Sequence, residues 1–85
     1  MKNLCEVSEK EIASKTQLLM ETLGRNIKKK RIEIKLKRVE LAFYASTTES
    51  MICNIENGKK PGISIYTLVK ISSVLEITLD DLFCE

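Results

Sequence analysis

Apolar residues recur at steps of three and four along most of the chain, which is the spacing of an amphipathic α-helix. The first run forms one mostly apolar stripe that consists of Ile12, Thr16, Leu19, Met20, Leu23 and Ile27. Ser8, followed three residues later by Glu11, has the form of a capping box and predicts a helix start near residue 9. The pattern leaves open whether this helix continues unbroken to residues 34–36 or is divided at Gly24.

Four further helices are predicted beyond this stripe. The expected ranges are 38–44, 49–56, 64–75 and a short helix after residue 78. Thr48, Ser64 and Thr78 each stand at the start of one of these ranges, where a hydroxyl oxygen can accept a hydrogen bond from the first helical turn. No segment makes a convincing strand, so we expect an all-α fold.

The stretch from Leu41 to Gly58 has the layout of two short helices that cross closely. Ala42 permits the close crossing, Ile52 and Ile55 follow at helical spacing and can point inward, and Gly58 stops the second helix. This is the layout of a helix-turn-helix. In a small basic protein without a catalytic constellation, it predicts that the second of the two helices reads DNA.

Length and composition agree with one small folded domain, because 85 residues with 44% hydrophobic side chains can build a single core. No apolar run approaches the roughly 18 residues that span a bilayer, and the N-terminus lacks a secretory signal. We therefore expect a cytoplasmic protein that does not bind membranes.

The residues that usually carry catalysis or bind metals are scarce in this chain. Its three cysteines, Cys5, Cys53 and Cys84, lack Cys-x-x-Cys spacing, and there is no histidine. Only an improbable all-cysteine cluster could hold zinc, so we interpret the thiols as incidental and expect no cofactor. With neither a glycine-rich phosphate loop nor a nucleophile placed near a base, the chain is not expected to be an enzyme.

Charge is distributed unevenly along the chain. Residues 25–38 contain eight lysines and arginines and one glutamate, a net charge of +7, whereas residues 76–85 contain four acids and no base, a net charge of −4. A polyanion would bind the first segment and avoid the second. A basic run alone is more often a solvated helix face, but its position directly before the helix-turn-helix favours DNA as a partner.

The chain resembles the lambda-repressor-like helix-turn-helix family, also called the Cro/phage-repressor or XRE family, over roughly residues 23–83. The matching positions are Leu23, Gly24, Ile27, Arg31, Leu41, Ala42, Ile52, Ile55, Glu56, Asn57, Gly58, Thr67, Leu68, Asp81 and Leu82. The resemblance implies a compact bundle of five helices whose third helix lies in the major groove of DNA. Residues 23–85 would form this domain, preceded by a helical extension at residues 1–22.

The resemblance also implies roles for individual residues. The expected DNA-binding residues are Arg38, Thr47, Thr48, Glu49, Ser50, Cys53, Asn54, Asn57, Lys59 and Lys60. Glu49, Ser50 and Asn54 match positions that reach base edges, while the residues that follow the third helix match phosphate contacts. Alternatively, the negative charge of Glu49 could only interact favourably with the positive N-terminal end of its helix. Arg31 and Glu56 are expected to pair and to lock the third helix to the scaffold.

Five residues depart from the family pattern. Ser46 and Glu76 stand where glycines are usual, and Lys37 replaces a serine or threonine cap, which removes about 1 kcal/mol. Thr47 replaces an aliphatic residue of the turn, and Lys30 replaces a leucine. These changes bear on the geometry of the turn and on the base contacts, whereas the fold is expected to hold.

The expected function is that of a sequence-specific transcriptional regulator that represses its own operon. Such a repressor would belong to the phage-type, restriction–modification controller or antitoxin class. A homodimer on a palindromic operator is expected, with two recognition helices about 34 Å apart. The residues that either form a dimer patch or pack onto the fourth helix are Ile77, Leu79, Leu82 and Phe83.

Two alternatives remain open at this stage. Leu18, Leu19 and Met20 of the extension could cover the domain, enlarge a dimer or bind another protein, and we expect the extension to fold back onto the domain. The alternative function is a protein-interaction module that has kept the fold and lost DNA reading. Glu49 and the missing turn glycine favour this alternative, while the basic segment opposes it.

Overall fold

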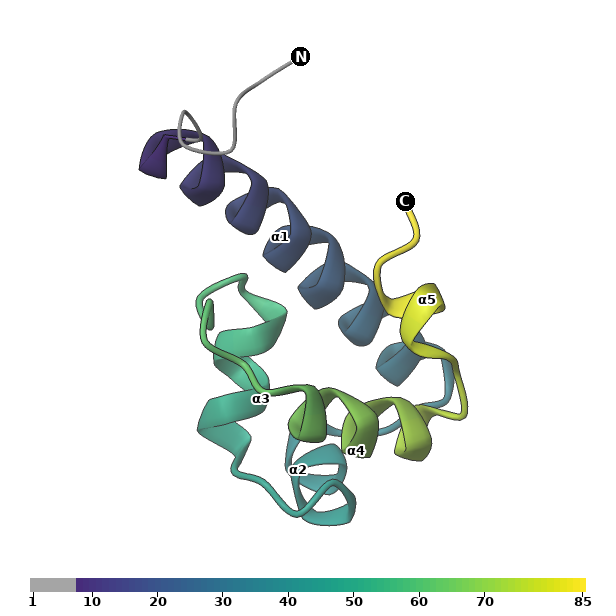
Figure 1. Ribbon diagram of the computed structural model, residues 1–85. Coiled ribbons are helices and arrows are strands. Elements are labelled where there is room, and N and C mark those ends of the chain that lie inside the picture. Colours follow the sequence, from purple (N-terminus) through teal and green to yellow (C-terminus); the bar gives the residue numbers. More distant parts are fainter. Residues whose placement is uncertain (1–7) are drawn as a thin grey trace.

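The computed structural model describes residues 8–85, which form five α-helices and no strand (Figure 1). The helices are α1 (Glu9–Glu33), α2 (Arg38–Tyr44), α3 (Glu49–Glu56), α4 (Ile65–Leu75) and α5 (Leu79–Leu82). The predicted all-α bundle is confirmed, and the predicted helix bounds are correct to within a few residues.

Four helices begin at hydroxyl caps that the sequence predicts. The side chains of Ser8, Thr48, Ser64 and Thr78 each accept a hydrogen bond of 3.1 Å from the backbone N–H three residues later. Helix α2 starts instead at Lys37, whose side chain has no acceptor. Here the Glu40 carboxylate accepts a bond of 2.9 Å from the Lys37 N–H, so half of a capping box remains where the hydroxyl cap is missing.

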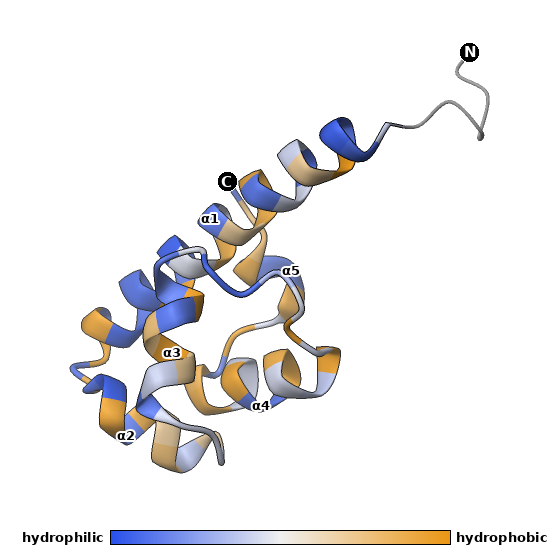
Figure 2. Ribbon diagram, turned by 90° about the vertical axis from the view of Figure 1, so that its left-hand side faces the viewer, coloured by the Kyte–Doolittle hydropathy of each residue, from blue (hydrophilic) through white to orange (hydrophobic). Residues whose placement is uncertain are grey.

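Helix α1 is continuous across Gly24 and comprises 25 residues. Its buried residues all lie from position 20 onward, and the preceding turns extend beyond the bundle (Figure 2). Ile12, Leu18 and Leu19 are more than half exposed there. The expected fold-back is therefore wrong for Leu18 and Leu19, because no turn interrupts the backbone ladder that carries the helix straight outward, whereas Met20 is buried. Residues 1–7 lie outside the described part of the chain.

The core lies where α1 to α5 meet. Its fully packed residues are Leu23, Ile27, Leu41, Ala42, Ala45, Ile52, Ile55, Leu68, Ile71, Leu75 and Leu82. Ile77 and Leu79 pack half-buried against this cluster. Of the four apolar residues near the C-terminus, Phe83 is the most exposed, with 37% of its surface accessible to solvent. Packing within the domain therefore uses most of the apolar surface that could otherwise have formed a dimer patch.

Two positions that lack the usual glycine adopt left-handed backbone conformations. Ser46 has φ 53° and Glu76 has φ 57°. For a residue with a Cβ, this conformation costs about 1–2 kcal/mol, so both positions carry backbone strain. The Ser46 carbonyl accepts a hydrogen bond of 3.3 Å from Lys70 Nζ, which ties the turn to α4.

Candidate nucleic-acid interface

Helix α3 presents one polar face to solvent and buries the other. Ile52, Ile55 and Glu56 are buried, whereas Glu49, Ser50 and Asn54 are exposed. Cys53 is half-buried beside them. Ser50 and Asn54 are four positions apart and share one face of the helix, and Glu49 lies beside Ser50 at the start of the helix.

This polar face continues into the turn before α3 and the loop after it. Thr48 is exposed and Thr47 is half-buried in the turn, while Asn57 and Lys59 are exposed and Lys60 is half-buried in the loop. The Asn57 amide donates to Cys53 Sγ at 3.4 Å, and the Lys59 N–H donates to the Asn54 carbonyl at 2.8 Å. The structure thus places nine of the ten predicted DNA-binding residues, all except Arg38, along one stretch from position 47 to position 60.

The Glu56 carboxylate at the end of α3 accepts hydrogen bonds from two arginines. Arg31 donates from Nε to Oε2 at 2.7 Å and from Nη2 to Oε1 at 3.1 Å. Arg38 donates from Nε to Oε1 at 3.0 Å. The Glu56 side chain has no exposed surface, so this carboxylate is desolvated and depends on the two guanidinium groups.

The expected pair of Arg31 and Glu56 is therefore present, and Arg31 also donates from Nη1 to the Leu36 carbonyl at 2.8 Å. Arg38, which was expected among the DNA-binding residues, also donates to this carboxylate. The hydrogen bond that Arg38 donates to Glu56 and the negative charge of Glu56 raise the pKa of Arg38. No spacing in the sequence signals this second pair, since it depends on the start of α2 meeting the end of α3.

Two glycines fix α1 against the end of α3. A Cβ on Gly24 would lie 2.4 Å from the Ile55 carbonyl oxygen and 2.7 Å from that of Glu56. Gly58 adopts φ +69°, and a Cβ there would lie 3.4 Å from Cγ of Glu21. The backbone of α3 and its following loop therefore lies directly on the surface of α1.

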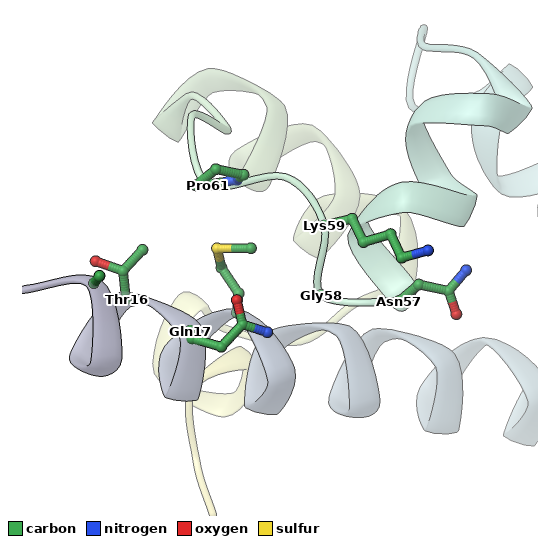
Figure 3. Close-up of a pocket in the computed structure, with 8 residues that line it drawn as sticks. Thr16, Gln17, Asn57, Gly58, Lys59 and Pro61 are labelled. Carbon is green, nitrogen blue, oxygen red and sulfur yellow. The ribbon is translucent and has the colours of Figure 1, made fainter. Parts of the chain in front are cut away.

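An open groove lies between the outer part of α1 and the loop that follows α3. Figure 3 shows Thr16 and Gln17 on α1 opposite the loop residues Asn57 to Pro61. Met20 also lines the groove, and only 8% of its surface is exposed. The part of α1 that precedes residue 24 thus flanks the same loop that carries Lys59.

The basic segment, residues 25–38, provides exposed charge on the last turns of α1 and on the loop before α2. Five of its eight basic side chains are exposed, namely Arg25, Lys28, Lys29, Lys35 and Lys37. Lys30 is half-buried and lies 3.5 Å from Glu33, while the remaining two are the arginines at Glu56. The segment is therefore a largely solvated cationic surface with a buried ion-paired centre.

Within residues 8–85, no group of three or more histidine, cysteine or acidic residues could hold a metal ion. None of the described helices combines the length and apolar character needed to cross a membrane. Cys53 and Cys84 are free thiols, and Cys5 lies outside the described residues.

A family model described as helix-turn-helix matches residues 27–82. The match includes all of α2, α3 and α4, the last turns of α1, and α5 to its end. Comparison with curated proteins and with solved structures gives no match.

Proposed function

Because the chain belongs to the lambda-repressor-like (Cro/phage-repressor) helix-turn-helix family of DNA-binding regulators, we propose that it is a sequence-specific repressor that acts on its own promoter. The outward face of α3 supports this proposal most directly. Its Glu49, Ser50 and Asn54 are solvent-exposed polar side chains, while Ile52 and Ile55 anchor the opposite face in the core.

In this proposal α3 enters the major groove as the recognition helix. Asn54 can donate to and accept from the edge of an adenine, and Ser50 can bond to either kind of base. Glu49 can accept from the amino group of a cytosine. The loop after α3 offers Asn57, Lys59 and Lys60 to the phosphate backbone, where contacts set the position of the protein without reading sequence.

A homodimer on a palindromic operator is part of the proposal, because one short recognition helix reaches only a few base pairs. Two-fold symmetry would place two copies of α3 about 34 Å apart, in successive major grooves on one side of the DNA. Phe83 and the outer turns of α1, with Ile12 and Leu19, are exposed apolar surface that such a dimer could bury.

The test is a fluorescence-anisotropy titration of the full chain against DNA from its own promoter and against a scrambled duplex, at two salt concentrations. We expect a preference for the promoter of about 10³-fold or more. Asn54→Ala should weaken the free energy of binding to the promoter duplex by about 1–3 kcal/mol and relax the sequence preference at one base pair. Lys59→Ala should weaken binding to both duplexes and lower the salt slope by about 1.

Lys10→Ala is the matched control, because Lys10 is an exposed cation near the outer end of α1 and is not in the proposed contact set. It should leave the preference unchanged. Equal binding of both duplexes by the wild-type protein would refute sequence-specific repression and leave only a charge-driven interaction.

A second candidate function is a protein-interaction module with this fold. The observation in its favour is an exposed aromatic pair at the end of α2, where the rings of Phe43 and Tyr44 are 77% and 61% exposed and meet edge to face. Large exposed aromatic side chains are enriched at protein interfaces. Failure of the full chain to bind either duplex would favour this second function.

A further inference from the structure

The Glu56 carboxylate does more than lock the recognition helix to α1. We propose that Glu56 is a positioning residue for Arg38, which it holds ready to contact a DNA phosphate, so that the phosphate contact and the recognition helix are fixed by one buried group. The inference rests on the proposed DNA-binding function. The observation behind it is that the Glu56 carboxylate accepts hydrogen bonds from both Arg31 and Arg38.

The charges in this cluster do not cancel. Arg31 is buried and already makes two hydrogen bonds to Glu56, which is enough to neutralise its charge. Arg38 adds a second positive charge at the same carboxylate, so the cluster carries a net charge of +1. A surplus cation of this kind attracts a phosphate, whereas an isolated Arg31–Glu56 pair would be neutral.

Arg38 is held by one nitrogen and free at two others. Its Nε donates to Glu56, while its two terminal nitrogens have no hydrogen-bond partner within residues 8–85. Its side chain is 35% exposed, in contrast to 10% for Arg31. A guanidinium group is a rigid planar fork, so it can bind one anion through Nε and another through its outer nitrogens.

Because Glu56 restrains the Arg38 side chain before DNA binds, less conformational entropy is lost on binding. A free arginine loses rotamer freedom when it meets a phosphate, whereas Arg38 is already restrained by Glu56. Glu56 is the last residue of α3, and Arg38 is the first residue of α2. Any shift of the recognition helix therefore moves the phosphate contact with it.

The test measures the affinity for promoter and scrambled duplexes by fluorescence anisotropy over a range of salt concentrations. It compares the full chain with its Arg38→Gln, Arg38→Lys and Glu56→Gln variants. Arg38→Gln should lower the salt slope by about 0.9, as expected for the loss of one phosphate contact. Arg38→Lys keeps the charge and should still weaken binding about fivefold, because a single ammonium cannot fill both positions of the fork. Lys10→Arg, a charge-conserving exchange at an exposed position outside the basic segment, is the matched control and should bind like the wild type.

The direction in which Glu56→Gln changes the DNA affinity distinguishes most clearly between a positioning role and simple charge repulsion. Removing a negative charge near DNA ordinarily strengthens binding, whereas loss of the positioning carboxylate should weaken it. In the Arg38→Gln background, the effect of Glu56→Gln should shrink, because the group that it positions is gone. An Arg38→Lys variant with wild-type affinity, or a Glu56→Gln effect that is equal in both backgrounds, would overturn the proposal.

A purely structural role for Glu56 is distinguished by urea unfolding of the same variants. Coupling between Arg38 and Glu56 that appears in the free energy of unfolding and not in DNA binding also overturns the proposal. If Glu56→Gln does not fold, the comparison of Arg38→Lys with Lys10→Arg still decides whether the guanidinium of Arg38 is needed for DNA binding. Equal affinity for promoter and scrambled DNA would refute the repressor function alone, since the salt slope still reports the Arg38 contact; absence of any DNA binding would refute both.

Discussion

Replacing Gly24 by alanine tests whether the recognition helix is seated directly on α1. The added Cβ would meet three backbone atoms, the carbonyl oxygens of Ile55 and Glu56 at 2.4 and 2.7 Å and the Glu56 carbonyl carbon at 2.9 Å. No side-chain rotation can relieve contacts with backbone atoms. The end of α3 would have to retreat from α1 by about 1 Å to restore ordinary van der Waals contact.

Two opposing free energies set the magnitude. Alanine is favoured over glycine in a helix interior by about 1 kcal/mol, which stabilises the variant. Forcing extra volume into a packed contact costs about 1–3 kcal/mol, and the upper end applies because the retreat also moves Ile55, which is part of the core. We expect a net loss of about 2 kcal/mol in the free energy of unfolding and a melting temperature lower by about 10 °C.

The assay is urea unfolding followed by circular dichroism at the helical band. Gly62→Ala is the matched control, since nothing lies within 4 Å of its added Cβ and its backbone is not left-handed, so its stability should change little or rise slightly. Gly58→Ala should lose about 1 kcal/mol through its positive φ alone. A Gly24→Ala protein as stable as the wild type would refute the seating of α3 on α1.

Three further changes in unfolding free energy follow, each measured by the same urea titration. Ser46→Gly should stabilise by about 0.5–1 kcal/mol by relieving a left-handed serine, and a loss of stability would contradict the strain. Thr48→Ala should cost about 1 kcal/mol, because the first turn of α3 loses its cap; no change would mean that another group replaces it. Leu23→Ala should cost about 3 kcal/mol, whereas Leu18→Ala should stay within about 0.5 kcal/mol, and equal losses would show that the outer turns of α1 are buried.

The helix starts could be predicted from the sequence because each depends on a local signal. A hydroxyl directly before an apolar periodic stretch is enough to identify Ser8, Thr48, Ser64 and Thr78 as caps. The pair of Arg31 and Glu56 was equally accessible, although only through the family resemblance. Ser46 stands where the family pattern has a glycine, so the sequence predicted an effect on the geometry of the turn, and the observed φ is 53°.

The course of the N-terminal extension could not be predicted from the same signals. The apolar stripe from Ile12 to Ile27 suggests one continuous buried face, but only its second half meets the rest of the domain. Periodicity reports which residues share a helix face and says nothing about where the neighbouring helices end. The expectation of a fold-back failed because Gly24 serves close packing against α3 and does not end the helix.

The second arginine at Glu56 was missed for a related reason, and it changes how the interface works. A family pattern assigns a role to each position separately, so it implied DNA binding for Arg38 and a pair with Arg31 for Glu56. In the structure Arg38, Arg31 and Glu56 come from three different helices and meet at one buried carboxylate. Substituting any one of the three therefore changes the electrostatic environment of the other two, which is why their effects should be read from double-mutant cycles and not from single replacements.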